Sequence, residues 1–132
     1  MSDNLKLVNF IIKELIKNNS HKLEFIASVD FAYYLNSEPK QNFAQLAKRA
    51  AMVQWNTILI TSKVTSTDDT HFYQDFEIQI PTDNRENSMV YGHTEFVVIR
   101  GLLSKVTIKH FLSKQDFDEF NNRLKASSVA LL

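Results

Sequence analysis

Residues 30–50, DFAYYLNSEPKQNFAQLAKRA, contain the change from strand to helix on which the fold assignment depends. Alternate residues of the first part are apolar, which predicts a short strand with one face rich in aromatic surface: Phe31, Tyr33 and Leu35. Pro39 ends this strand. Apolar residues then recur at the spacing of an amphipathic helix: Phe43, Leu46, Ala47, Ala50 and Val53. On this helix, Lys48 and Arg49 are expected to face water.

The residues before this stretch are predicted to be helical. Ser2 or Asp3 can cap a first helix, whose apolar residues recur every three or four positions: Leu5, Val8, Ile12 and Leu15. A second, short helix is predicted over residues 22–27, with Ser20 as its cap. The N-terminal half therefore reads as three helices with one strand between the second and the third.

After Trp55 the hydrophobic period changes from that of a helix to that of a strand. Four segments with β-branched or alternating apolar residues are predicted to be strands: residues 56–66, 71–80, 88–100 and 104–112. Ser113 and Asp116 have the spacing of a capping box at the start of a last helix, whose apolar side holds Phe117, Phe120 and Leu124. Helices followed by an antiparallel run of strands indicate an α+β domain.

Composition narrows the range of partners. The 132 residues are 44% hydrophobic and 23% charged, as in one ordinary globular domain. Fifteen basic and fifteen acidic residues give a net charge of +0, which argues against nucleic acid and anionic membranes as partners. There is no cysteine, the start MSDNLKLVNF lacks the pattern of a secretion signal, and no apolar run is long enough to span a bilayer. We therefore expect a cytoplasmic protein.

The last hairpin determines which polar side chains of the sheet point inward. In the final strand one face is predicted to carry Val106, Ile108, His110 and Leu112. A three-residue turn at 101–103 would place Val98, Phe96 and Thr94 opposite the first three of these, in that order. Glu95 would then lie outside, beside the lysines of the neighbouring strand. A two-residue turn would instead bring His93 and Glu95 inward, and the sequence leaves both registers open.

This order of elements resembles that of the SnoaL-like polyketide cyclases and ketosteroid isomerase, members of the nuclear transport factor 2-like superfamily. NSEPKQNFAQLAK (36–48) is similar to the isomerase's turn into its third helix, and IRGLLSKVTIKHF (99–111) to a common ending of SnoaL-like sequences, with two extra residues between glycine and lysine. The resemblance implies one domain over residues 1–132, with a cone-shaped α+β fold whose N-terminal helices pack on a curved antiparallel sheet. It also implies an apolar cavity and homodimers, but no single activity.

The isomerase's catalytic groups do not accompany this resemblance. Its chemistry needs a general base, together with donors that stabilise an enolate oxygen in a dry pocket. The resemblance implies that these groups fall at positions without matching side chains: Leu35 or Asn36 for the base, Ile11 for the tyrosine donor, and Thr94 or Phe96 for the protonated acid. Glu38 could reach the rim of a pocket, but a turn glutamate beside a proline is more often solvated.

Candidate site residues come from the predicted inward faces. His110 is the polar residue among apolar neighbours, which suits a ligand contact or an acid–base group, but also a hydrogen-bonded core histidine. Tyr33 suits a donor in a pocket as well as core filling. The predicted ligand-binding set is Tyr33, Trp55, Phe76, Thr94, Phe96 and His110. Asp75 and Glu77 are expected on a solvated or interface face. The four histidines lack metal-ligand spacing, so we predict neither a metal nor a cofactor.

Two classes of function fit these predictions. The first is a binding protein whose cavity holds a small hydrophobic or aromatic molecule, with any turnover being of the isomerase, cyclase or lyase type. The alternative is a non-catalytic module that uses its sheet face for homo- or hetero-association, with side chains such as Trp55 and Phe76 filling the cavity. An open hollow between Tyr33, Phe96 and His110 would favour the first class.

Overall fold

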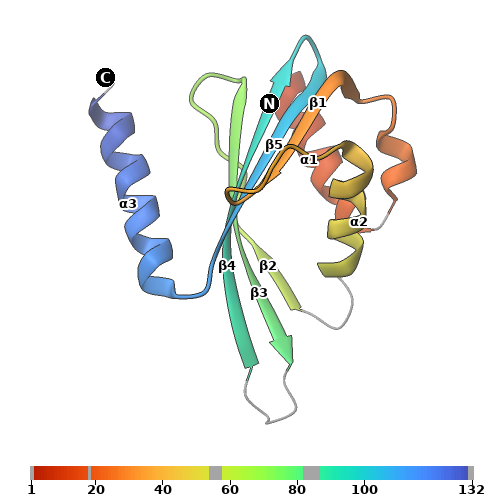
Figure 1. The fold of residues 1–132 in the computed structure, drawn as a ribbon. Coiled ribbons are helices and arrows are strands. Elements are labelled where there is room, and N and C mark those ends of the chain that lie inside the picture. The colour runs from red at the N-terminus through yellow and green to blue at the C-terminus, as the bar shows by residue number, and fades with distance from the viewer. Residues whose placement is uncertain (1, 18, 54–57, 82–86, 131–132) are drawn as a thin grey trace.

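The described residues form three α-helices, one short 3₁₀ helix and a five-stranded sheet (Figure 1). The computed structural model describes residues 2–17, 19–53, 58–81 and 87–130. Its elements are α1 (Asp3–Ile16), η1 (Ser20–Leu23), β1 (Ala27–Leu35), α2 (Phe43–Val53), β2 (Ile58–Thr61), β3 (His71–Pro81), β4 (Asn87–Ile99), β5 (Leu102–Phe111) and α3 (Lys114–Ala130). The predicted α+β class is confirmed.

The sheet has the strand order β1-β5-β4-β3-β2. β2 pairs with β3, β3 with β4, and β4 with β5, each time antiparallel as predicted. β1 pairs parallel with β5, so the sheet is mixed rather than wholly antiparallel. β1 and β5 are far apart in sequence, and a parallel pair can be joined only by a long connection. α1 and α2 lie on one side of the sheet and α3 on the other (Figure 1).

The first helix begins where the sequence predicts. Ser2 is the N-cap, and its hydroxyl oxygen accepts a hydrogen bond from the Leu5 backbone N–H at 3.0 Å. Val8 and Ile11 of this helix are fully buried in the hydrophobic core. The predicted helix over residues 22–27 is wrong, because the 3₁₀ turn η1 ends at Leu23 and β1 has already begun at Ala27.

The quoted strand-to-helix stretch folds as predicted. Every second residue of β1 is buried at its C-terminal end: Phe31, Tyr33 and Leu35. Asn36 then takes a left-handed conformation with φ of 55°, and its side-chain oxygen accepts the backbone N–H of His110 at 2.8 Å. At the start of α2, Asn42 and Gln45 exchange side-chain-to-backbone hydrogen bonds of 2.8 and 2.9 Å. The Asn36 bond ties the turn after β1 to β5, and the Asn42–Gln45 pair caps the start of α2.

The β4–β5 hairpin combines features of both predicted registers. Its turn holds two residues, Arg100 and Gly101, both with positive φ, as a type I′ turn requires. Ser104 has no partner in β4, because Val97 pairs with Lys105 and Val98 with Leu103. This bulge restores the inward face that a two-residue turn alone would have reversed. The resulting pairs are Phe96 with Val106, Thr94 with Ile108, and Gly92 with His110.

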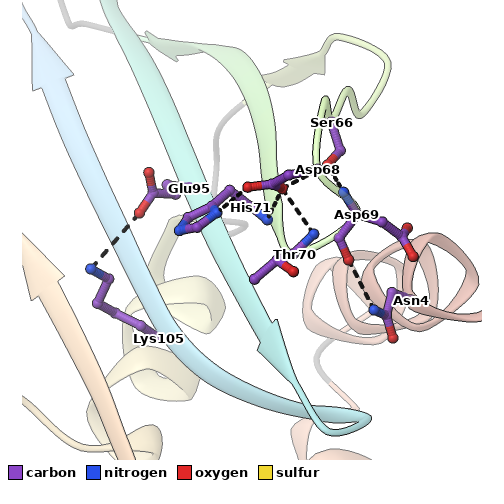
Figure 2. A network of polar contacts seen from close by, with 8 residues as sticks. All are labelled: Asn4, Ser66, Asp68, Asp69, Thr70, His71, Glu95 and Lys105. Carbon is purple, nitrogen blue, oxygen red and sulfur yellow. Dashed lines mark hydrogen bonds and ion pairs between the residues drawn. The ribbon is translucent and has the colours of Figure 1, made fainter. Parts of the chain in front are cut away.

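The faces of the alternative with a three-residue turn are therefore right, but the register of that alternative is off by two residues. Thr94 now lies opposite Ile108 instead of His110. Glu95 lies on the other face, where its carboxylate is 3.9 Å from the Lys105 ammonium, as expected (Figure 2). Leu112, predicted to point inward, lies beyond the end of β5 and is 84% exposed.

A network of polar contacts joins the turn before β3 to the start of α1 (Figure 2). The backbone carbonyl of Asp69 accepts from the Asn4 side chain at 2.9 Å. The Asp68 carboxylate accepts from the backbone N–H groups of His71 and Thr70 at 2.7 and 2.9 Å, and from the His71 ring at 2.6 Å. These bonds hold the pKa of Asp68 well below its ordinary value, and the bond from the His71 backbone has the largest effect.

Candidate functional site

A hollow of about 120 Å³ lies between the sheet and the helices α1 and α2. Most of its wall is apolar, with side chains from both helices and from four of the five strands. The apolar wall includes Ile12, Leu15, Leu46, Ala50, Leu59, Phe76, Ile78, Phe96, Val106 and Ile108. The polar groups in the wall are few: Arg49, Thr61, Gln74, Thr94 and His110. A mostly apolar concavity with a few polar groups is the usual form of a small-molecule site.

His110 contributes an uncharged imidazole to the hollow. It lies on β5, and its ring meets the Phe76 ring edge-on, with 5.7 Å between centroids. Burial lowers the pKa of His110 to about 4, and the nearby positive charge of Arg49 acts in the same direction. At neutral pH the ring can therefore donate one hydrogen bond and accept another, but it is a weak base.

Arg49 lines the hollow and is half-buried, so the prediction that it faces water holds only in part. It lies on α2 one residue before Ala50, at the border of the helix's apolar side. Its Nε atom is buried and has no hydrogen-bond partner in the described part of the chain. Lys48, the preceding basic residue, is exposed as predicted.

The predicted ligand-binding residues do not all reach the hollow. Phe76, Thr94, Phe96 and His110 line it, whereas Tyr33 does not. Tyr33 is 1% exposed and belongs to the hydrophobic core, and its hydroxyl has no hydrogen-bond partner among the described residues. Burial raises the pKa of that hydroxyl. Trp55 lies outside the described residues. Ligand binding by this set stays a prediction.

Gly92 does not line the hollow, but it lies against Phe76, which does, and the sequence reasoning missed this contact. It lies between Phe76 on β3 and His110 on β5, at the same level of the sheet. A Cβ atom at this position would be 1.9 Å from the Phe76 ring, so the ring lies directly over the glycine backbone. An isolated glycine within a strand is the signal that could have revealed this close approach.

The opposite face of the sheet carries a second group of polar and aromatic residues, beneath α3. His93 is buried, and its Nδ1 atom is 2.8 Å from a carboxylate oxygen of Asp75. Tyr73 stacks on one side of the imidazole and Phe120 meets it edge-on, at 5.6 and 5.1 Å between centroids. The predicted solvated face is thus partly covered by α3 at Asp75. An open groove of about 800 Å³ runs beside it, toward the β2–β3 connection.

No carboxylate lines the hollow among the described residues. Glu38 is exposed in the turn after β1, where its carboxylate accepts a 3.4 Å hydrogen bond from Gln41. The described residues also hold no group of three or more side chains arranged to bind a metal ion, and no helix with the length and apolarity needed to cross a bilayer. The hollow thus offers a neutral imidazole, a guanidinium and neutral polar groups, without a carboxylate base.

Several solved structures share this architecture at low sequence identity. A protein assigned as a SnoaL-like polyketide cyclase from Jannaschia superposes with a TM-score of 0.66 at 12% identity, covering 83% of this chain and 86% of that one. A protein assigned as a polyketide cyclase from Xanthomonas campestris superposes with a TM-score of 0.63 at 18% identity, covering 87% of this chain and 93% of that one. An NTF2-like protein of unknown function from Cytophaga hutchinsonii superposes with a TM-score of 0.63 at 5% identity, covering 80% of this chain and 97% of that one.

No protein-family model and no curated protein matches this sequence. The likeness therefore rests on element order and sheet pairing rather than on shared residues, and such a likeness carries no activity with it. It does extend over four fifths or more of this chain in each of the three structures. The chain has the nuclear transport factor 2-like fold found in SnoaL-like proteins.

Proposed function

We propose that this protein binds a small, largely apolar molecule in the hollow between its sheet and helices α1 and α2. The observation that carries the proposal is the hollow itself: about 120 Å³ of space with a mainly apolar wall and five polar side chains. The apolar side chains of this wall line a concavity, which is the usual form of a site for a small apolar ligand. In the alternative, side chains such as Trp55 and Phe76 fill the cavity; Phe76 lines the hollow, and Trp55 lies outside the described residues.

The size of the hollow limits the ligand. An apolar cavity of about 150 Å³ is known to hold one benzene molecule, so this hollow suits a single ring or a short branched chain. Phe76, Phe96 and Ile108 offer apolar contact, while Thr94 and His110 offer hydrogen bonds that orient the ligand. A larger polyketide would extend past the hollow toward solvent.

The polar groups favour binding over carboxylate-dependent catalysis. Proton abstraction beside a carbonyl requires a base whose pKa lies near the working pH. The described wall has no carboxylate, and the lowered pKa of His110 makes it a poor base at pH 7. If the protein turns over its ligand by isomerase, cyclase or lyase chemistry, we propose that His110 acts as a hydrogen-bond donor to a ligand oxygen.

Filling the hollow tests this proposal. Ala50 lines it from α2, so Ala50→Phe should occupy the ligand's space, whereas Ala44→Phe adds the same ring to an exposed position of the same helix. A thermal-shift screen with toluene, phenol and cyclohexanol is the assay. At about 100 times the dissociation constant, a bound compound should stabilise the wild type by about 2.7 kcal/mol. The shift should vanish in Ala50→Phe and persist in Ala44→Phe; equal shifts in both variants would reject the hollow as the site.

We also propose that the protein is a homodimer. Phe25 and Val29 are 89% and 110% exposed and lie four residues apart around the start of β1, an edge strand of the sheet. Exposed apolar side chains that lie near one another are typical of association sites. A monomeric mass by light scattering at micromolar concentration would rule this out.

A further inference from the structure

Arg49 is a charged residue in the wall of the hollow whose surroundings supply no acceptor for its Nε–H among the described residues. It carries a positively charged guanidinium with donor groups only. Its Nε atom is buried without a hydrogen-bond partner, and no Asp or Glu lies within ion-pair distance of it among the described residues. The residue as a whole is half-buried, but its buried Nε–H has lost its hydration without gaining an acceptor, and buried polar groups in proteins are normally hydrogen-bonded.

The charge of Arg49 acts on the hollow itself. The residue lies in the wall, and its positive charge is the second cause, after burial, of the lowered pKa of His110. The same charge acts on the Tyr33 hydroxyl, as does the opposite charge of Glu38 to a smaller extent. Since the described wall has no negative group, the hollow combines an apolar surface with a net positive charge.

We infer that the ligand of this hollow is a small apolar monocarboxylate, whose carboxylate pairs with the Arg49 guanidinium while its hydrocarbon part fills the apolar space. This inference rests on the proposed function and adds the charge and class of the ligand. A carboxylate matches the fork of donors that a guanidinium presents, and such charge-assisted bonds are stronger than neutral ones. The buried Nε–H would then gain the acceptor that the protein does not supply.

The neutral state of His110 agrees with such a ligand. A neutral imidazole can donate to the second carboxylate oxygen without adding another charge to the hollow. With room for about one ring, the hydrocarbon part corresponds to a benzene or cyclohexane ring. Benzoate and cyclohexanecarboxylate are therefore suitable probes, and benzamide is the uncharged match of benzoate in shape.

The test compares the affinities of benzoate and benzamide, measured by calorimetry or NMR titration, in the wild type and two variants. Arg49→Gln removes the charge inside the hollow, whereas Lys48→Gln removes the same charge from the neighbouring exposed position. We expect benzoate to bind the wild type at least about tenfold more tightly than benzamide. That ratio should fall to about one in Arg49→Gln and remain in Lys48→Gln. Thermal melts check that both variants are folded.

The outcomes separate this inference from the function it rests on. Equal affinities for benzoate and benzamide in the wild type, or a benzoate preference that survives Arg49→Gln, would overturn the monocarboxylate while leaving an apolar ligand in place. Binding of toluene without binding of benzoate would likewise overturn the monocarboxylate and leave an apolar ligand in place. If none of these probes binds at millimolar concentration, the proposed function fails together with the inference.

Discussion

Gly92→Ala should destabilise the protein through one identified contact. The new methyl carbon would lie 1.9, 2.3 and 2.4 Å from three atoms of the Phe76 ring. Carbon atoms pack favourably at about 3.5 Å or more, so the ring has to move by roughly 1.5 Å. The ring also contacts His110, and moving it disturbs the wall of the hollow.

Two opposing terms set the size of this effect. Overpacking of a well-packed site costs about 1–3 kcal/mol. Replacing glycine by alanine inside a strand returns about 0.5–1 kcal/mol, because the alanine backbone has less freedom to lose. The free energy of unfolding of Gly92→Ala should therefore fall by up to about 2.5 kcal/mol, as measured by urea denaturation.

The sign of the effect should reverse when the ring is absent. In a Phe76→Ala background only the favourable backbone term remains, so Gly92→Ala should stabilise the protein by about 0.5–1 kcal/mol. Such a reversal is a strong coupling between the two positions in a double-mutant cycle. If Gly92→Ala has the same effect in both backgrounds, the close contact between the ring and the glycine backbone does not exist in solution.

Two further perturbations test the site and the helix that covers it. Burial lowers the pKa of His110 from 6.5 to about 4. Between these two pH values the His110 ring is therefore protonated in the unfolded state and neutral in the folded state. Stability should therefore decline as the pH falls from 6.5 to about 4, and His110→Ala should remove that part of the decline; an NMR titration giving a His110 pKa near 6.5 would contradict the burial. Ser2→Ala removes the cap of α1 and the hydroxyl that donates to Asp69, and should cost about 1 kcal/mol in urea denaturation. Asn4→Ala removes only the side-chain bond to the Asp69 carbonyl and should cost less, so an equal or larger loss there would contradict the capping role.

The local elements were largely predictable because local signals determine them. The alternation of Phe31, Tyr33 and Leu35 and the helical spacing from Phe43 onward each correspond to an observed element. The short helix over residues 22–27 failed because three or four residues of periodicity do not separate a 3₁₀ turn from an α-helix. The 3₁₀ turn and the start of β1 share that segment.

The pairing of elements was less predictable, since it depends on contacts between distant residues. Nothing near Ala27 indicates that β1 will lie parallel to β5, and nothing near Ser104 indicates a bulge. The inward face of the hairpin was still right, because burial of Phe96 and Val106 selects one face whichever turn is used.

The site depended on the exact width of the apolar side of α2. Arg49 lies at its border, and only the position of the sheet decides whether such a residue reaches water or the hollow. Tyr33 shows the converse error: its strand face was predicted correctly, but that part of the face is covered by the core rather than by the hollow. Sequence periodicity describes which side of an element is buried, and not what it is buried against.

The most direct test of the account is a crystal structure of the protein determined under xenon pressure. Xenon enters apolar cavities that side chains leave unfilled. We predict an anomalous peak in the hollow, among Phe96, Val106 and Ile108. If side chains occupy that space and no xenon is found there, the hollow is not a ligand site and the central claim is wrong.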